Sequence, residues 1–406
     1  MPLNPAESLV HELCTSSFFS LWSIANPSRP SGKELCDVLV VCDSDVIIWS
    51  VKEIKYVDTG SAVGLRRWQR KAIDESIDQL RGALRSLERM TEVSSPNAVA
   101  ALPLPSSDRR KVHRIAVALG SDGSVPLYEP NAGGEHFHVM DESALRVLLQ
   151  ELDTITDFVD YLQAKEAFLK NTQVIESGGE RDLLGLYLQH GRQFPSGQSL
   201  LIVDEGIWET LTAKPNWEAR KRAEASSYTW DRIIETFVSD FATTPPGERG
   251  PVNSLDAVAR TMARESRFAR RLLADAFLEF MALASSNKIR ARYTRSPSGV
   301  VYVFLATNRN AARTDRVAEL TARCWVARGE LLDATTVVGI ATERYEGMPG
   351  FSLDAVKVHI PEWTEEHEKQ KRYLRNDLGF FRTTLKTETH VDEYPNPQTG
   401  GSEESS

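Results

Sequence analysis

Apolar and polar positions in the first third of the chain alternate in patterns that predict a β-sheet. Apolar runs over 34–42 and 46–56 are separated by the polar turn Cys42-Asp-Ser-Asp45, which together predict a β-hairpin. A helix is expected over 5–14, where apolar residues recur at helical spacing. An alternating segment with aromatic residues over 18–25 predicts a further strand. The rest of the chain is organised around the hairpin.

Downstream of the hairpin, apolar residues repeat every three or four positions over 65–90, which predicts a long amphipathic helix. A strand is expected over 111–119. The order is therefore helix, three strands, long helix, strand. Because a helical crossover joins the hairpin to the last strand, those two strands are expected to pair in parallel. The predicted fold class is α/β, with a mixed β-sheet flanked by helices.

The chain has 406 residues, a length that suits two or three domains. Breaks in the apolar patterns indicate where one domain ends and the next begins. We expect a first domain over 1–170 and a helical or mixed connecting region over 171–250. The clearest break is the Pro- and Gly-rich stretch over 243–251. A second, smaller α+β domain over 251–392 follows, and the polar acidic tail over 393–406 is expected to be disordered.

Composition narrows the functional class. The net charge of −9 and the pI near 5.6 argue against non-specific coating of nucleic acid but leave room for a local basic groove. No apolar run reaches the roughly 18 residues of a membrane span, and the first residues do not resemble a signal peptide. Without Cys-x-x-Cys spacing, the four cysteines are expected to be buried free thiols: Cys14, Cys36, Cys42 and Cys324. A cytoplasmic protein without a membrane partner is predicted.

The hairpin carries candidate chemistry. Asp37 lies in its first strand and Lys52 near the end of its second strand. A carboxylate and a lysine that meet at the end of a hairpin can hold a metal ion and steady an anion beside it. Phosphodiester hydrolysis needs both, because water must be activated and extra negative charge on phosphorus stabilised. Glu34, three residues before Asp37, points to the opposite face of an extended strand and is a weaker ligand candidate.

The order of elements and the spacing of these residues resemble the core of the PD-(D/E)XK nuclease superfamily, the fold of many restriction enzymes and Holliday-junction resolvases. In that superfamily an Asp in one strand is followed, about one hairpin later, by an acidic residue, any residue and a Lys. Members often carry a Glu in the first helix, and some carry a Gln that faces the site from the crossover helix. Asp37, Lys52, Glu7 and Gln79 match these positions, although Gln79 also suits a helix surface. The resemblance covers about the first third of the chain.

The sequence departs from the family pattern at Ser50, which stands two positions before Lys52 where an acid is expected. Glu53 could replace that acid from the neighbouring position if the strand bulges. Alternatively, Glu53-Ile-Lys55 is itself the acid-x-lysine motif, because residues two apart in a strand share a face. In a third interpretation the site is degenerate and binds no metal.

The resemblance implies a metal-dependent endonuclease that hydrolyses DNA phosphodiester bonds, and a bacterial defence or restriction setting fits by analogy. The candidate catalytic residues are Glu7, Asp37, Lys52, Glu53, Lys55 and Gln79. The carboxylates Glu7, Asp37 and Glu53 would hold Mg²⁺ or Mn²⁺, with Lys52 beside the attacking water. The alternative function, which Ser50 favours, is a catalytically degenerate nuclease fold that acts as a nucleic-acid-binding or regulatory subunit.

Two basic stretches are candidate DNA contacts. The first contains Arg66, Arg67, Arg70 and Lys71, although a charge run on a helix is usually only a solvated face. The second combines one face of a predicted helix with alternate positions of a strand: Arg260, Arg264, Arg267, Arg271, Lys288, Arg290 and Arg292. Its excess positive charge indicates a polyanion partner, or else ion pairs with acidic segments elsewhere. DNA is the predicted partner, together with a second copy of the chain or another protein.

His136-Phe-His138 has the spacing of two side chains on one face of a strand, which suits metal ligation. A site of this kind needs at least three protein ligands. The sequence shows no third ligand nearby, so we do not predict a metal site there.

Overall fold

The structure, a computed structural model, describes most of the chain. The described residues are 3–58, 60–94, 101–121, 131–132, 135–176, 178–243, 255–286, 288–307, 311–343, 352–382 and 391–396, with single residues 123, 125, 127 and 129. Most of the predicted break at 243–251 and of the predicted disordered tail, from 397 onwards, lies outside them.

The chain divides into two compact units, Met1–Trp217 and Glu218–Ser406. The expected connecting region is shared between them. Strands β10 (Gln173–Glu176) and β11 (Leu200–Val203) pair in parallel within the first unit. Helix α9 (Ser227–Thr243) belongs to the second unit, where it packs against the two helices that follow it. The first unit therefore extends about fifty residues beyond the domain end expected at 170.

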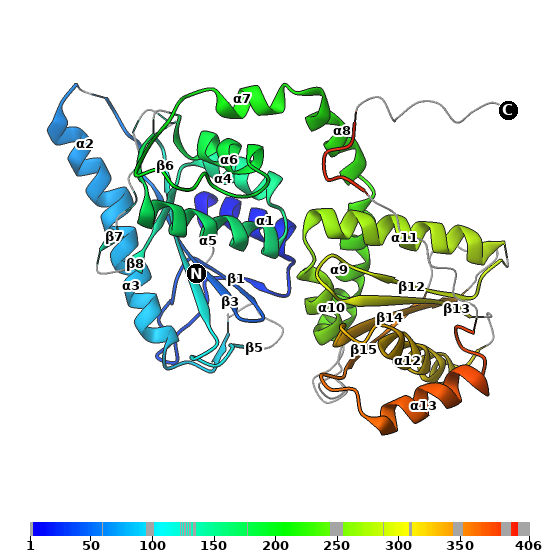
Figure 1. Cartoon of the computed structure of the whole chain (residues 1–406). Helices are drawn as coiled ribbons and strands as arrows, with labels where there is room; N and C mark the ends of the chain where they lie inside the picture. The colour runs from blue at the N-terminus through cyan, green and yellow to red at the C-terminus, as the bar shows by residue number, and fades with distance from the viewer. Residues whose placement is uncertain are drawn as a thin grey trace. The chain divides into compact units, whose positions relative to one another are not determined.

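Five strands form the central sheet of the first unit in the order β1-β2-β3-β6-β9 (Figure 1). They are β1 (Ser23–Ala25), β2 (Val38–Cys42), β3 (Asp45–Glu53), β6 (Lys111–Leu119) and β9 (His138–Met140). The β1–β2 and β2–β3 pairs are antiparallel, whereas β3–β6 and β6–β9 are parallel. The sheet is mixed, and the parallel pairing expected across the helical crossover is present.

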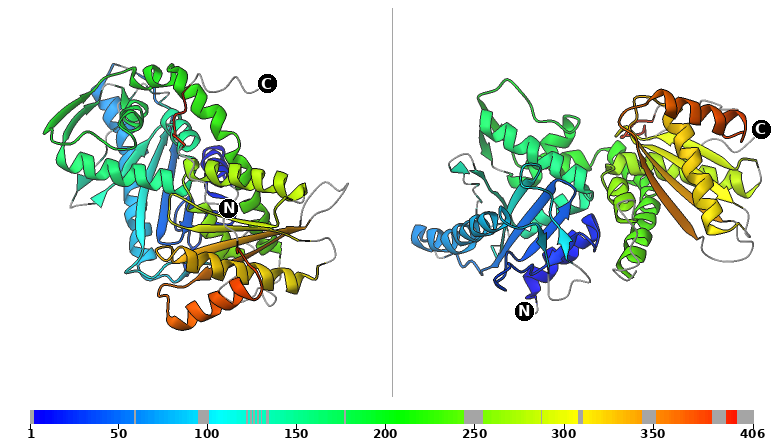
Figure 2. Two further views of the ribbon diagram at one scale, coloured as in Figure 1. Left: turned by 45° about the vertical axis from the view of Figure 1, so that its right-hand side comes forward. Right: turned by 90° about the horizontal axis from the view of Figure 1, so that it is seen from below.

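Helices cover both faces of this sheet (Figure 2). They are α1 (Pro5–Phe18), α2 (Ala62–Gln69), α3 (Glu75–Leu87), α4 (Glu142–Glu151) and α5 (Ile155–Asn171). Trp49 of β3 stacks on Phe158 of α5 with ring centroids 5.8 Å apart, whereas its neighbour Ser50 is hydrogen-bonded to Gln79 of α3. Because strand residues alternate between faces, α5 and α3 cover opposite sides of β3.

The crossover helix predicted over 65–90 is interrupted. A five-residue π-helical turn, η1 (Arg70–Asp74), separates α2 from α3. Such a turn adds a residue to the helix and rotates the side chains that follow, and it often occurs at functional sites. Smaller elements complete the unit: β4 (Glu92–Val93), β5 (Leu102–Pro103), β7 (Asn131–Ala132), β8 (Glu135–His136), α6 (Gly179–Gln189) and α7 (Ile207–Thr212), with α8 (Pro215–Glu224) crossing the boundary.

The second unit is built on a four-stranded mixed sheet in the order β12-β13-β14-β15. Its strands are β12 (Ala291–Arg295), β13 (Val301–Thr307), β14 (Thr336–Glu343) and β15 (Leu353–His359), and its further helices are α10 (Leu255–Ala263), α11 (Arg267–Ser285), α12 (Arg313–Glu330) and α13 (Glu365–Asn376). Strands β12 and β13 form an antiparallel pair. The predicted helix that carries Arg260 and Arg267 is two helices, α10 and α11, and the Ser266 hydroxyl caps the first turn of α11.

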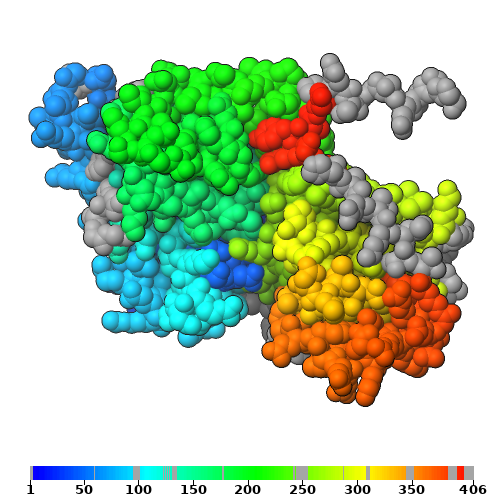
Figure 3. Space-filling model, viewed as in Figure 1, coloured from blue at the N-terminus to red at the C-terminus, as the bar shows by residue number. Residues whose placement is uncertain are grey.

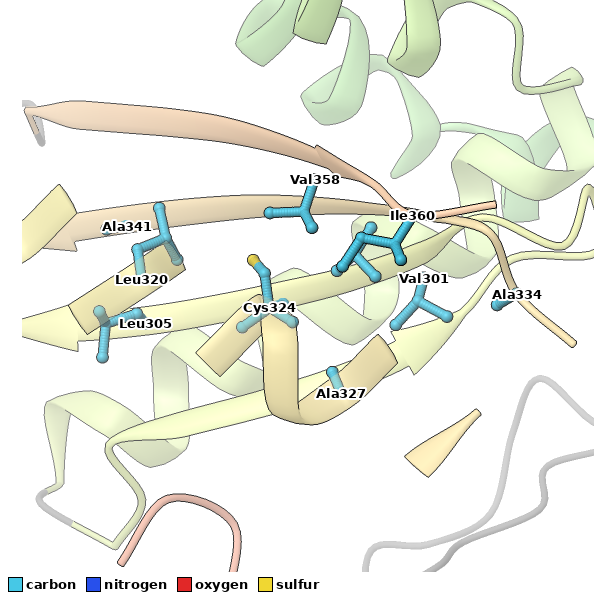
Figure 4. Close-up of a cluster of buried hydrophobic side chains, with 11 residues drawn as sticks. Val301, Leu305, Leu320, Cys324, Ala327, Ala334, Ala341, Val358 and Ile360 are labelled. Atoms are coloured by element: carbon cyan, nitrogen blue, oxygen red, sulfur yellow. The ribbon is translucent and has the colours of Figure 1, made fainter. Parts of the chain in front are cut away.

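One hydrophobic cluster of the second unit lies between α12 and the sheet (Figure 4). Leu320, Cys324 and Ala327 recur at helical spacing on α12 and are fully buried against the sheet residues Val301 and Leu305. All four cysteines of the chain are buried and free of disulfides, which confirms the expectation. In the described part of the chain, no helix is long and apolar enough to cross a membrane.

Candidate functional site

Asp37 lies at the point where β2 and β3 stop pairing through their main chains. The paired residues run from Cys42 opposite Asp45 to Val38 opposite Trp49. One position further on, the carboxylate Oδ2 of Asp37 accepts a hydrogen bond from the Val51 N–H at 2.5 Å. The side chain thus replaces a main-chain acceptor, which fixes the carboxyl group at the edge of the hairpin. Only 8% of Asp37 is exposed.

A second carboxyl group lies beside Asp37. Burial, together with a smaller effect of the Glu34 side chain, raises the pKa of Asp37 to about 6, against the opposing effects of the Val51 N–H and the Lys52 ammonium. Glu34 was expected to face away, on the assumption of a continuous strand. Regular β2 begins only at Val38, and Glu34 forms an isolated bridge with Ser28, so strand alternation does not extend to it. Glu34 is exposed, and its side chain acts on the pKa of Asp37, which the alternation pattern did not indicate.

Ser50 and Lys52 share the face of β3 that carries Asp37. The last antiparallel pair is Val38 opposite Trp49, so one step further Asp37 lies opposite Ser50. Residues directly opposite each other in a sheet point to the same side. The Ser50 hydroxyl is buried and donates a hydrogen bond to the Oε1 atom of Gln79 at 2.8 Å. Gln79 therefore reaches the face of β3 that carries Ser50, and two neutral groups stand where an acid was expected.

Glu53 and Lys55 lie elsewhere. β3 pairs with β6 residue by residue up to Glu53 opposite Leu119, without a bulge. Glu53 consequently points to the face opposite Lys52 and is exposed. Lys55 follows the end of the strand and is also exposed. The structure does not bring Glu53 together with Asp37.

Glu7 has a structural role at the start of α1. Its carboxylate accepts from the Asn4 main-chain N–H at 3.1 Å and from the Asn4 side-chain amide at 2.6 Å, while the Asn4 side chain caps the Glu7 N–H. This reciprocal pair is a capping box. Among the described residues, no hydrogen bond connects Glu7 to Asp37.

The first basic stretch is anchored next to the end of β3. The Trp68 indole donates a hydrogen bond to the Ile54 carbonyl at 2.6 Å and meets Tyr56 edge to face. Helix α2 projects from the surface of the first unit (light blue in Figures 1 and 3). Arg66, Arg67 and Arg70 are exposed and Lys71 is half-buried. Within the described chain, none of these four forms an ion pair.

The second basic stretch is largely neutralised. Arg267 and Arg271 are each 2% exposed: Arg267 pairs with Asp231 at 2.7 Å, and Arg271 donates to the carbonyls of Asp392 and Glu393. The remaining pairs are Arg260–Asp256, Arg290–Glu319 and Arg292–Glu279. Arg264 is half-buried in the break between α10 and α11, and Lys288 is exposed. The expected continuous basic face is absent from these described residues, because acids from other elements pair with most of it.

A cavity of about 320 Å³ adjoins the end of the sheet next to Lys52. Its lining includes Ala118, which lies opposite Lys52 in the parallel register, and Gly120, Asp141 and Arg146. Among the described lining residues there is no candidate site residue.

A separate polar cluster lies under α5, on the face of the sheet opposite to the one that carries Asp37 and Lys52. His136 and His138 lie close to the carboxylate of Glu129, which is the third group that the sequence did not reveal. Burial lowers the pKa of His138 to about 4, against the opposing effect of its hydrogen bond with Glu166. The sequence analysis found no third ligand near His136 and His138, and the structure corrects this expectation with Glu129.

Comparisons with other proteins assign no family. The chain matches no family model, no curated protein and no solved structure. The chemistry of the site is therefore inferred from its own residues.

Substituting Asp37 with Asn is expected to stabilise the chain at neutral pH. Because the pKa of folded Asp37 lies above its ordinary value of 3.8, the stabilisation by its bound proton is complete below about pH 4 and is lost as pH rises through about 6. Asp37→Asn keeps an acceptor for Val51 N–H and removes the buried charge. We expect a gain of up to about 3 kcal/mol in unfolding free energy at pH 7.5, and little gain at pH 4.

Urea denaturation at the two pH values measures this difference. Glu53→Gln, which removes an exposed carboxylate from the same hairpin, is the matched control and should change stability little at either pH. Equal destabilisation by Asp37→Asn at both pH values would contradict the raised pKa.

Proposed function

We propose that the first unit is a metal-dependent endonuclease that hydrolyses DNA phosphodiester bonds on a restriction-endonuclease-like core. The observation that carries the proposal is the Asp37–Glu34 carboxyl pair at the edge of the hairpin, beside Lys52. The order of a helix, an antiparallel three-stranded start and a parallel crossover supports the fold assignment. The family motif has an acid where this chain has Ser50. In this proposal Glu34, and not Glu53, provides the missing carboxylate.

The residues present fit a hard divalent cation. Two carboxyl groups that share a hydrogen bond repel each other when both are ionised, and a dication relieves that repulsion as a proton does. Asp37 and Glu34 would hold Mg²⁺ or Mn²⁺ through oxygen ligands. When bound, such an ion lowers the pKa of a water ligand and offsets charge on phosphorus.

The side chains around the pair have separate tasks. The Val51 N–H holds one oxygen of Asp37 in place, which leaves the other oxygen for a ligand. Lys52 lies close enough to Asp37 to affect its pKa, and its ammonium would orient the scissile phosphate and neutralise developing charge. Gln79 engages Ser50 through its carbonyl oxygen, so its amide N–H groups are available to a substrate oxygen.

The basic residues of α2 would grip the DNA backbone. Arg66, Arg67 and Arg70 are exposed cations without ion-pair partners among the described residues, and Trp68 ties their helix to the end of β3. Phosphate contacts of this kind position a duplex without reading its sequence. The DNA substrate would thus run from α2 across the strand ends that carry Asp37 and Lys52.

The second candidate function is a nuclease-fold protein that binds nucleic acid or regulates a partner without cutting. The buried Ser50–Gln79 hydrogen bond favours it, because this neutral pair occupies the position of a metal-binding acid. In that case the α2 cations would still bind DNA, and the carboxyl pair at Asp37 would hold a proton in place of a metal.

Cleavage assays distinguish the two functions. Plasmid and short duplex DNA are incubated with Mg²⁺, Mn²⁺ or EDTA, and products are resolved on gels. We expect metal-dependent cutting that falls by about 100-fold or more in Asp37→Ala, Lys52→Ala and Glu34→Gln. Glu53→Gln and Glu7→Gln should cut at nearly the original rate. Binding without cutting on every substrate would support the second function, and loss of cutting in Glu53→Gln alone would overturn the role of Glu34.

The α2 cations should set the salt dependence of DNA binding. Each lost phosphate contact reduces the slope of log affinity against log salt by about 0.9, so Arg66→Gln with Arg67→Gln should reduce it by about 2. Fluorescence anisotropy with labelled duplex measures the slope. Arg290→Gln with Arg292→Gln, which removes the same charge from paired positions, is the control. Equal slope changes in the two double variants would contradict the placement of the DNA.

A further inference from the structure

The polar cluster under α5 has the composition of a transition-metal site. One ring nitrogen of His136, one of His138 and one carboxylate oxygen of Glu129 all lie within 4.8 Å of one another. The two imidazole rings meet at a centroid distance of 4.7 Å. Two nitrogen ligands and one oxygen ligand are a donor set that Zn²⁺ and related ions prefer, whereas Mg²⁺ prefers oxygen alone.

His138 is oriented as a metal ligand would be. It is fully buried, and its Nε2 lies 3.1 Å from the Glu166 carboxylate. Its Nδ1 is buried, has no hydrogen-bond partner and lies 4.0 Å from Oε1 of Glu129. An imidazole that donates through one nitrogen to a carboxylate presents a lone pair on the other nitrogen, which is the usual arrangement of metal-binding histidines. An unsatisfied buried acceptor is costly, and a cation at this point would satisfy it.

The charge in the cluster also favours a cation. Three carboxylates lie in or near the cluster: Glu129 belongs to it, Glu166 pairs with His138, and Glu180 pairs with the neighbouring Lys165. Among the described residues, Lys165 is the one permanently charged side chain in ion-pair contact with them: it pairs with Glu129 at 2.5 Å and with Glu180. When all of these groups are ionised, the cluster has two negative charges in excess. One divalent ion balances that excess.

This cluster is separate from the Asp37 site. His138 lies opposite Ile115, which in turn lies opposite Trp49, and directly paired residues share a face. His138 is therefore on the Trp49 face of the sheet, whereas Lys52 is on the other face. The two sites would take different ions for different purposes.

We propose that Glu129, His136 and His138 bind a divalent transition-metal ion of the Zn²⁺ class, with Glu166 positioning His138. The ion joins Glu129, which precedes the short β7–β8 pair, to strand β9 and thereby fastens this connection beneath α5. The three protein ligands are at most 14% exposed, so the surrounding side chains would shield a bound ion from solvent. Its occupancy is independent of whether the Asp37 site cleaves DNA.

Metal binding by the full chain tests the proposal without an activity assay. The protein is stripped with chelator, titrated with Zn²⁺ by calorimetry, and loaded with Co²⁺ for visible absorption spectroscopy. We expect one equivalent of Zn²⁺, a Co²⁺ spectrum with nitrogen ligation, and a higher melting temperature in excess Zn²⁺ than in excess Mg²⁺. His136→Asn and His138→Gln should lose stoichiometric binding.

Two further variants keep the test decisive if the buried histidine variants do not fold. Glu166→Gln changes a half-exposed side chain and should weaken Zn²⁺ binding by about 10-fold or more, as expected for a positioning partner. His113→Gln removes a buried histidine that pairs with Asp45 outside the group and should leave the stoichiometry unchanged. Absence of stoichiometric binding to the original chain, or equal affinity in folded His136→Asn and His138→Gln, would overturn the proposal.

Discussion

The hydrogen bond from the Val51 N–H to the Asp37 carboxylate is the constraint on which the candidate site depends. It forms where the main-chain pairing of β2 and β3 ends, so the carboxyl group takes over as acceptor in the sheet. The bond holds a titratable group that is 8% exposed beside a second carboxyl group and a lysine. The cost of burying that charge raises the pKa of Asp37, and this is the basis on which we propose a cation site there.

The arginines of the two basic stretches differ in whether they have ion-pair partners. The arginines of α10, α11 and β12 mostly meet carboxylates or carbonyls within their own unit, and Arg267, Arg270 and Arg271 of α11 are almost completely buried. They therefore act as internal connections of the second unit. The arginines of α2 lack ion-pair partners in the described chain and lie on a projecting helix. Basic composition alone did not distinguish these situations.

The sequence predicted elements whose cause is local. The hairpin, the parallel crossover and the mixed sheet follow from apolar periodicity, which reports burial directly. Features that depend on distant partners were missed. Asp231 lies 36 residues from Arg267, so no local pattern could reveal that pair. Glu129 lies seven positions before His136, in a sequence that shows no strand periodicity.

Sequence patterns also failed over short separations along the chain. Strand alternation correctly separates Lys52 from Glu53, but it fails for Glu34, because regular β2 starts only at Val38. The helix break before α11 has one local signal in the sequence, the N-cap residue Ser266. The apolar stripe continues on both sides of it and hides the break. The turn η1 has no sequence signal that we recognise, although it changes the faces that α2 and α3 present.

The most direct test of the central claim is the titration of the Asp37 carboxyl carbon by NMR, with and without Mg²⁺. The carboxyl pair predicts a midpoint near pH 6 in metal-free solution. It also predicts that Mg²⁺ lowers this midpoint by one pH unit or more, because the cation competes with the shared proton. A midpoint near the ordinary value of 3.8 that Mg²⁺ leaves unchanged would contradict the account.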